Sequence, residues 1–334
     1  MTRPSKMSRP ALSIVVPTVA DTAALEATLV SVLENRPDDS EIVVPLACPY
    51  DDPWNIREEV RFVQAPESAG LVACTNLGIA ASAAPVIHVL AAGCRATPGW
   101  TDHPLQRIAA GEAAAVVPLG VTAEEPGKIL SAGIRVTRGG RRIAIVPGRR
   151  AYRGGSFEPN SVVPSGPALE AGFWRADVLA TAGPGFPAAC GDSHADADLA
   201  AALASLGEPV VLEHRSRVIW AAARPRATPF AAGLAAERLF WRSLAQGGIL
   251  SRLARHIAEV ARDAVTSGPF RGFSMLAGRT TGFLQYGDHV ARVRQLRAIV
   301  RRAEEADRPT VRIDGAHGVR RPRGEVAPPL KRSA

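Results

Sequence analysis

The sequence predicts an α/β protein built on a doubly wound, mostly parallel sheet of the Rossmann-like type, followed by a C-terminal α-helical extension. Apolar runs of strand length alternate with helical segments over residues 12–120, as in chains that form parallel sheets. These runs are continuously apolar, which is typical of strands covered on both faces. From about Thr228 onward, the apolar residues recur at helical spacing only.

The first strand is predicted at Leu12–Pro17, where the β-branched run LSIVVP ends in proline. The helix TAALEATLVSVLEN follows, with Leu25, Leu29, Val32 and Leu33 on one face. Further segments continue this alternation, with strands at EIVVPL (41–46), VRFVQA (60–65) and PVIHVLAAG (85–93), and a helix at SAGLVACTNLGIAASA (68–83). Together they indicate a parallel sheet.

Beyond Trp100 we expect a helix and then the strand AAAVVPLG (113–120). Residues 122–165 are richer in Gly, Arg and Pro, which predicts a loop-rich excursion carrying an antiparallel hairpin. The α/β pattern returns with a strand and helix in PALEAGFWRADVLATAG (167–183), a helix in HADADLAAALASLG (194–207) and a last strand in EPVVLEH (208–214).

Two amphipathic helices are predicted in the C-terminal part. Their apolar faces carry Leu250, Leu253, Ile257, Val260 and Ala264 in one helix and Val290, Val293, Leu296 and Val300 in the other. Arginines surround both faces, so the helices either cover the protein's own core or lie on an anionic membrane surface. We divide the chain into a flexible N-terminus (1–10), an α/β domain (11–225), a helical extension (226–306) and a disordered basic tail (307–334).

Composition narrows the class of protein. The 334 residues are 46% hydrophobic and contain no apolar run of eighteen, so we expect no membrane-spanning helix. The basic N-terminus precedes a strand-like run rather than a signal peptide's apolar stretch, and the four cysteines lack metal-ligand spacing. We therefore expect a cytoplasmic protein with reduced thiols. The net charge of +8 favours anionic partners, but aromatics are only 5%, which argues against nucleic acid.

Several segments, in this order, resemble the family-two glycosyltransferases, inverting enzymes of the GT-A fold. They are SIVVPT (13–18), VRFVQAPESAGLVACTNLGIAASAAPVIHVL (60–90), ATPGW (96–100), GPALEAGFWRADVLATAGPGF (166–186) and GDSHADADLAAALASLGEPVVLEH (191–214). The resemblance runs from about Leu12 to Trp220. It implies that the sheet's carboxyl edge binds a nucleotide-sugar and that a glycan or lipid-linked acceptor enters from the far side.

In that family an Asp-x-Asp pair holds a divalent ion against the donor diphosphate. The corresponding positions here are Ala91 and Gly93, which offer no side-chain ligand. A thiolate at Cys94 is too soft a ligand for Mg²⁺. We therefore predict no metal cofactor. Arg95 either supplies positive charge in place of the ion or is simply solvated.

Other donor contacts implied by the resemblance are preserved only in part. Pro17 and Thr18 end the first strand at the donor side. Asp21 follows, as a helix N-cap or as a nucleotide contact. Asn76 matches the second residue of the family's Arg-Asn pair, whose first position is Thr75. The family's nucleotide-binding Asp at the end of the second strand is missing, and Asp51 and Asp52 either replace it or form a turn.

The catalytic helix is the best-preserved polar motif. Where the family has Glu-Asp-x-Asp-Leu, residues 195–199 read Ala-Asp-Ala-Asp-Leu. Asp196 is then the general base, or else an acid that complements the helix dipole. Asp198, His194 and Arg149 are candidate acceptor or diphosphate contacts.

Two further departures from the family pattern bear on activity. The family's His near position 220 is Trp220, with His214 as an uncertain replacement. The Arg-rich segment RGGRRIAIVPGRRAYRGG (138–155) is either a diphosphate clamp or a solvated loop.

Two functions follow from these observations. One is sugar transfer by a divergent, metal-independent enzyme. The other is a catalytically inactive relative that acts as a binding or scaffold partner in polysaccharide assembly. The apolar segment GFSMLAGRTTGFLQY (272–286) and the basic helices around it add an anionic membrane surface as a third kind of partner.

Overall fold

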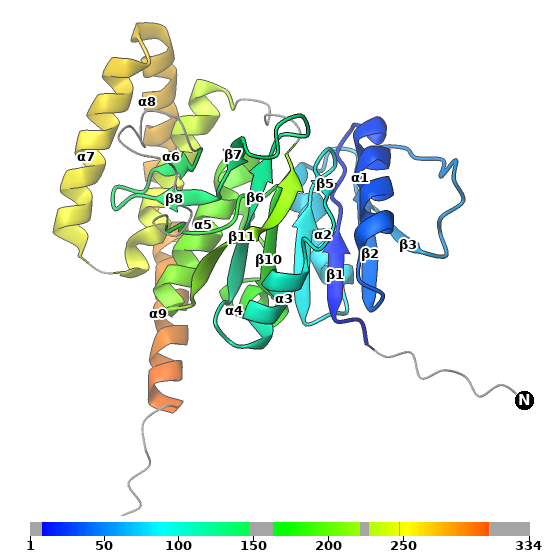
Figure 1. Ribbon diagram of the computed structural model, residues 1–334. Coiled ribbons are helices and arrows are strands. Elements are labelled where there is room, and N and C mark those ends of the chain that lie inside the picture. Colours follow the sequence, from blue (N-terminus) through cyan, green and yellow to red (C-terminus); the bar gives the residue numbers. More distant parts are fainter. Residues whose placement is uncertain (1–8, 147–162, 221–226, 247, 307–334) are drawn as a thin grey trace, which may run out of the picture.

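In the computed structural model, residues 9–146, 163–220, 227–246 and 248–306 are described. Their strands form a nine-stranded sheet in the order β3-β2-β1-β4-β10-β6-β11-β5, with β7 paired to β6 (Figure 1). The strands are β1 (Leu12–Val15), β2 (Ser40–Leu46), β3 (Val60–Gln64), β4 (Val86–Leu90), β5 (Arg95–Ala96), β6 (Ala115–Val121), β7 (Ile129–Ser131), β10 (Ala171–Arg175) and β11 (Val210–Ile219). A separate antiparallel hairpin joins β8 (Ile134–Val136) to β9 (Arg142–Ala144).

The sheet is mostly parallel, as predicted. β1 pairs in parallel with β2 and β4, β2 with β3, and β6 with β11. β10 runs antiparallel between β4 and β6, and therefore interrupts the parallel order at the centre of the sheet. The hairpin predicted within residues 122–165 is also confirmed.

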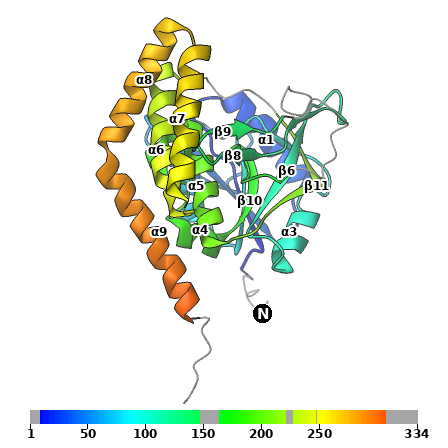
Figure 2. The ribbon, with the colours of Figure 1, turned by 90° about the vertical axis from the view of Figure 1, so that its left-hand side faces the viewer.

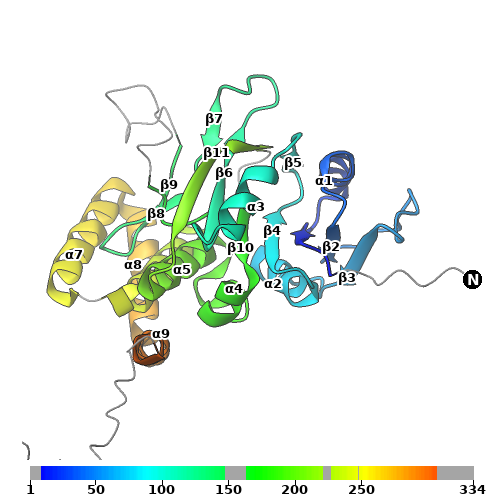
Figure 3. The same cartoon turned by 60° about the horizontal axis from the view of Figure 1, so that its bottom comes forward.

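Helices cover both faces of this sheet. One face carries α1 (Thr22–Asn35) and α3 (Asp102–Ala109), and the other carries α2 (Leu71–Ala81), α4 (Ala176–Ala182) and α5 (Gly191–Leu206) (Figure 3). Alternation within the strands explains this layering: Ile14 packs toward α1, whereas Val15 packs toward α2. The predicted helix stop at Gly207 is confirmed, because that residue has a left-handed φ of 72°.

The C-terminal helices are α6 (Pro229–Arg242), α7 (Ile249–Thr266), α8 (Pro269–Leu284) and α9 (Tyr286–Ala306). They stack beside the α5 side of the α/β unit, with α7 and α8 outermost (Figure 2). Glycines allow α6 and α8 to pack closely: a Cβ on Gly233 would lie 2.0 Å from the Met275 carbonyl oxygen, and one on Gly278 would lie 2.0 Å from that of Phe230. None of the described helices is both long enough and apolar enough to span a membrane.

The interpretation that both C-terminal amphipathic helices cover the core is partly wrong. It holds for α9, where Leu296 is 2% exposed. It fails for α7, where Leu250 is 85% exposed and Ile257 is 60% exposed. The reason is that α7 turns its polar side chains, Arg252 and His256 among them, toward the protein.

Candidate functional site

The site lies where the first turns of α2 and α5 meet. Leu71 begins α2 soon after β3, so this junction is at the carboxyl edge of the parallel strands, where α/β sheets bind ligands. The Asp192 carboxylate accepts hydrogen bonds from the backbone N–H groups of Leu71 and Val72, both at 2.9 Å. A Cβ on Gly70 would lie 2.4 Å from Asp192 Oδ2, so the glycine allows this cap. The cap fixes α5 against α2.

A pocket of about 770 Å³ opens beside this junction, between the N-terminal turns of α2 and α5 and the first half of α6. Polar residues line it from three elements and one helix cap, namely Arg142 on β9, Asp192 and His194 on α5, Arg238 on α6, and Thr228 at the N-cap of α6. Apolar residues of α6 and Leu71 form much of the remaining wall. Two guanidinium groups therefore line one pocket at the carboxyl edge of the sheet.

Arg142 forms a buried, bidentate ion pair with Asp196. Its Nε donates to Oδ1 at 2.8 Å and its Nη2 donates to Oδ2 at 2.7 Å. The backbone N–H of Leu169 also donates to Oδ2, at 3.2 Å. Burial lowers the pKa of Arg142, but the Asp196 carboxylate more than offsets this, so the pKa lies above its ordinary value. Asp196 thus lies behind Arg142, with both of its oxygens hydrogen bonded.

Asp198 does not line this pocket. Its Oδ2 accepts from Arg242 Nε of α6 at 2.5 Å and from the Cys190 thiol at 3.6 Å, and the residue is 2% exposed. Burial and the nearby Asp198 raise the pKa of the Cys190 thiol well above its ordinary value. In this structure Asp198 joins α5 to α6, and its contact with an acceptor or diphosphate stays a prediction.

The Arg238 side chain is half-buried and held at two points. Its Nε donates to Gln285 at 2.7 Å and its Nη1 donates to the Ala189 carbonyl at 2.6 Å. His194 is half-buried as well, with Nδ1 2.9 Å from the Ser193 hydroxyl. Of the two described residues predicted for acceptor or diphosphate contact, His194 lines this pocket and Asp198 does not. Arg149 lies outside the described residues.

The turn at the expected metal position does not fit a divalent ion. Ala91 is buried and its N–H donates to the Glu170 carbonyl at 2.8 Å. Gly93 has a φ of 96°, and its N–H donates to the Thr28 hydroxyl at 2.9 Å. Within the described ranges, no group of three or more His, Cys, Asp or Glu side chains is arranged to hold a metal ion.

Arg95 is half-exposed, on the short strand β5. Its side chain forms no hydrogen bond or ion pair with another described residue, and it does not line the pocket between α2, α5 and α6.

The remaining predicted donor residues have structural contacts. Thr18 is fully buried, and Pro17 and Thr18 join the ends of neighbouring strands through their backbone groups. Asp21 is the N-cap of α1, because its Oδ1 accepts from the Ala24 N–H at 2.9 Å. The Asn76 side-chain amide forms two hydrogen bonds with the backbone of Phe186. Its Nδ2 donates to the Phe186 carbonyl at 2.8 Å and its Oδ1 accepts from the Phe186 N–H at 2.7 Å.

The other uncertain replacements also lie elsewhere. Asp52 forms a turn, with Oδ1 accepting from the Ile56 N–H at 3.1 Å, as the turn interpretation expects. The Nδ1 atom of His214 lies 3.9 Å from Oε1 of Glu213, and His214 does not line the pocket between α2, α5 and α6. Trp220 packs over Gly120.

Two features of the site had no adequate signal in the sequence. Arg142 lies inside the Arg-rich segment proposed as a clamp, but nothing in the sequence pairs it with Asp196, 54 positions away. Arg238 lies in a segment for which the sequence predicted no site residue, and α6 places it in the pocket.

The architecture has counterparts among solved structures. Residues 1–349 of S. aureus TarS superpose with a TM-score of 0.55 at 13% identity, over 88% of this chain and 91% of that one. The fold is GT-A-like. The mannosyltransferase PcManGT from Pyrobaculum calidifontis, solved with GDP-Man and Mn²⁺, aligns over 90% of this chain and 88% of its own, with a TM-score of 0.49 and 16% identity. No protein-family model and no curated protein sequence matches the chain. At such low identity the similarity shows the fold alone.

Proposed function

We propose that this GT-A-like protein binds a nucleotide-sugar in the pocket between α2, α5 and α6 and transfers the sugar to a glycan or lipid-linked acceptor without a divalent ion. The observation that supports this most directly is the pair of arginines in the pocket, where the Asp192 carboxylate is engaged by the N–H groups of Leu71 and Val72. Arg142 and Arg238 both line the pocket, whereas the turn at Ala91–Cys94 carries no carboxylate. A guanidinium donates in the fork geometry that suits phosphate oxygens, so it can neutralise a leaving diphosphate.

Asp196 is the proposed base in this scheme, and Arg142 controls it. A donor diphosphate competes with Asp196 for Arg142, because both are anions that accept from the same guanidinium. Once released, Asp196 takes the proton of the acceptor hydroxyl as the acceptor oxygen bonds to the anomeric carbon. The bond from that carbon to the diphosphate breaks, and the diphosphate leaves with the electron pair.

Calorimetric titration with UDP, GDP and their sugars, first in EDTA and then in Mn²⁺, tests the proposal. We expect binding in EDTA that Arg238→Gln weakens by roughly tenfold or more, as for lost hydrogen bonds to a charged group. Arg95→Gln is the matched control, because Arg95 lies outside the pocket and should leave affinity unchanged. Binding that requires Mn²⁺ would overturn the metal-free scheme.

A second function is favoured by the buried Arg142–Asp196 pair itself. If a diphosphate cannot displace Asp196, the protein binds its ligand without transferring the sugar and serves as a scaffold partner in polysaccharide assembly. Release of nucleoside diphosphate, measured by mass spectrometry in the presence of candidate acceptors, separates the two functions. Binding without release supports the scaffold, and no binding to any nucleotide-sugar removes the support for both donor-based schemes.

A further inference from the structure

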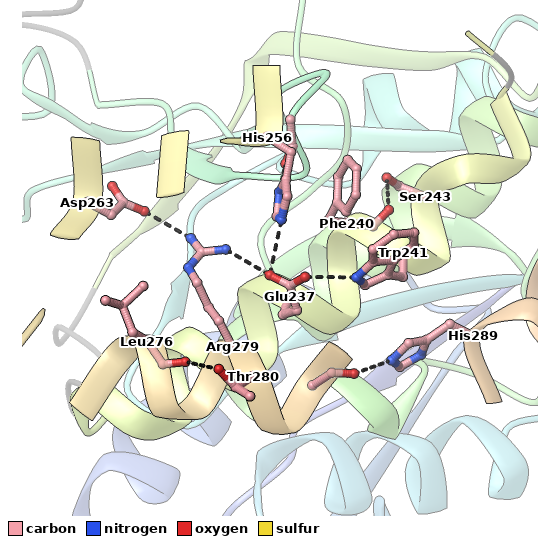
Figure 4. Close-up of polar contacts among 12 residues, drawn as sticks. Glu237, Phe240, Trp241, Ser243, His256, Asp263, Leu276, Arg279, Thr280 and His289 are labelled. Atoms are coloured by element: carbon pink, nitrogen blue, oxygen red, sulfur yellow. Dashed lines mark hydrogen bonds and ion pairs between the residues drawn. The ribbon is translucent and has the colours of Figure 1, made fainter. Parts of the chain in front are cut away.

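Helix α7 turns its polar face toward the protein. His256 stacks on Phe240 and its Nε2 lies 3.1 Å from the Glu237 carboxylate (Figure 4). Arg279 of α8 lies between two acids, with Nη1 3.3 Å from Glu237 Oε2 and Nη2 3.1 Å from Asp263 Oδ2. Burial raises the pKa of Glu237. The hydrogen bond from His256 and the charges of His256 and Arg279 lower that pKa by more than burial raises it, so it lies below its ordinary value.

More contacts extend this inward polar face along α7. Arg252 donates to the Ser243 hydroxyl at 2.9 Å, and Glu259 accepts from the Thr137 hydroxyl at 3.1 Å. The polar side of α7 therefore contacts α6, α8 and the loops after α6 and β8. The opposite side of the helix must face outward.

That outward side is apolar. On α7 it carries Leu250, Ile257 and Val265, and Val265 is 82% exposed. On α8, exposed apolar side chains recur at helical spacing at Phe270, Phe273 and Leu284. Phe270 is 90% exposed and Phe273 is 74% exposed, so neither ring contributes much to the protein's own core. We call these six residues the apolar α7–α8 face.

The two helices hold this face together as one unit. Only Ser267 and Gly268 separate α7 from α8, so Val265 and Phe270 lie close to the same turn. A Cβ on Gly272 of α8 would lie 3.0 Å from the Ala264 carbonyl oxygen of α7, which shows that the helices approach closely there. The hairpin forms the outermost layer of the molecule (Figures 1 and 2).

The charges on the two helices favour one kind of partner. Each exposed charged residue that the structure describes on α7 and α8 is an arginine: Arg255, Arg262 or Arg271. The acids of these helices, Glu259 and Asp263, face inward. A second copy of the same face would bring arginine against arginine, whereas an anionic bilayer offers negative charge to the rim and hydrocarbon to the apolar side chains.

We propose that the apolar α7–α8 face docks on an anionic lipid bilayer, with Phe270 and Phe273 inserted at the boundary between headgroups and acyl chains. Docking places the helical extension against the membrane and leaves the α/β unit in water. This inference does not depend on the proposed function, because α7 and α8 carry no side chain that lines the pocket of the candidate site.

Vesicle sedimentation of the full chain tests the proposal. The vesicles are phosphatidylcholine alone, or equal parts of phosphatidylcholine and phosphatidylglycerol. We expect binding to the anionic vesicles that high salt weakens, and that the double variant Phe270→Ser/Phe273→Ser weakens by roughly tenfold or more. The double variant Arg255→Gln/Arg262→Gln should weaken binding to the anionic vesicles.

Val30→Ser is the matched control, because Val30 is a 55% exposed apolar residue of α1, on the opposite side of the molecule (Figure 1). This variant should bind vesicles as well as the unaltered protein does. All variants should keep the thermal unfolding midpoint of the unaltered protein. The proposal is overturned if the protein ignores anionic vesicles, or if the double phenylalanine variant binds them equally well. A dimer in light scattering that this variant dissociates, without vesicle binding, would assign the face to a second copy.

Discussion

Replacing Asp196 with asparagine tests how far the Arg142–Asp196 pair supports the fold. The Asp196 side chain is fully buried and that of Arg142 is 17% exposed. Removing one partner of a buried ion pair costs about 3–5 kcal/mol, because the other charge stays buried without compensation. Arg142 keeps some contact with water and the substituted amide can still accept one hydrogen bond, so we expect about 3 kcal/mol, at the lower end of that range.

Thermal unfolding followed by circular dichroism measures this loss. Unfolding entropies are about 2.1 cal/mol/K per residue, so for 334 residues a loss of about 3 kcal/mol lowers Tm by roughly 4 °C. Arg142→Met alone should cost a similar amount. The double variant Asp196→Leu/Arg142→Met should recover most of the loss, because apolar replacement of a buried pair is often neutral or stabilising.

One result would refute this reasoning. If Asp196→Asn keeps the Tm of the unaltered protein, the pair contributes little to stability, and displacing Arg142 from Asp196 costs little. If Asp196→Asn also abolished sugar transfer while leaving Tm unchanged, Asp196 would be a base whose release from Arg142 costs little. A lowered Tm together with unchanged nucleotide affinity fits a pair that is structural in the resting protein.

Three further predictions concern positions away from this pair. Burial lowers the pKa of His88 to about 3, so below about pH 6.5 the unfolded chain binds a proton at His88 that the folded protein does not. The free energy of unfolding, measured by urea titration, should therefore fall by about 2 kcal/mol between pH 7 and pH 5. His88→Gln should make the free energy of unfolding less dependent on pH over that range. Asn76→Ala leaves two backbone groups of Phe186 unpaired and should cost about 1–3 kcal/mol in the same assay, with nucleotide affinity unchanged. Gly278→Ala should destabilise by about 1–3 kcal/mol or more through a clash with α6, whereas Gly287→Ala, whose Cβ meets no atom within 4 Å, should be neutral or stabilising.

The elements of the α/β unit were predictable because their signals are local. The helix at 22–35 was expected from its apolar spacing, and the structure confirms it together with the Asp21 cap. The buried strands were also predictable, because a continuous apolar run is a local feature of the sequence. The antiparallel insertion of β10 was not predictable, because strand order depends on contacts between distant segments.

Side-chain partners across long separations could not be predicted. His88 looks like one polar residue in an apolar strand, yet its Nδ1 lies 2.7 Å from the Gly172 carbonyl oxygen and its Nε2 accepts from Trp100 at 3.0 Å. Helix α7 shows the same limit. Its two faces are evident from the sequence, but which face is buried depends on Glu237 and Arg279 in other helices.

The absence of carboxylates at positions 91 and 93 is matched by the backbone and packing around them. Gly93 has a φ of 96°, which glycine adopts freely and an aspartate adopts only with strain. Ala91 is buried, so a carboxylate there would lose hydration without a cation to replace it. The Thr28 hydroxyl accepts from the Gly93 N–H and donates to the Cys94 carbonyl, which ties the turn to α1. Substituting two residues would therefore not recreate an ion site at this turn, because the turn has a geometry and burial suited to small, uncharged side chains. In the proposed function, cationic side chains meet the charge of a bound diphosphate, and the described pocket places Arg142 and Arg238 together for that role.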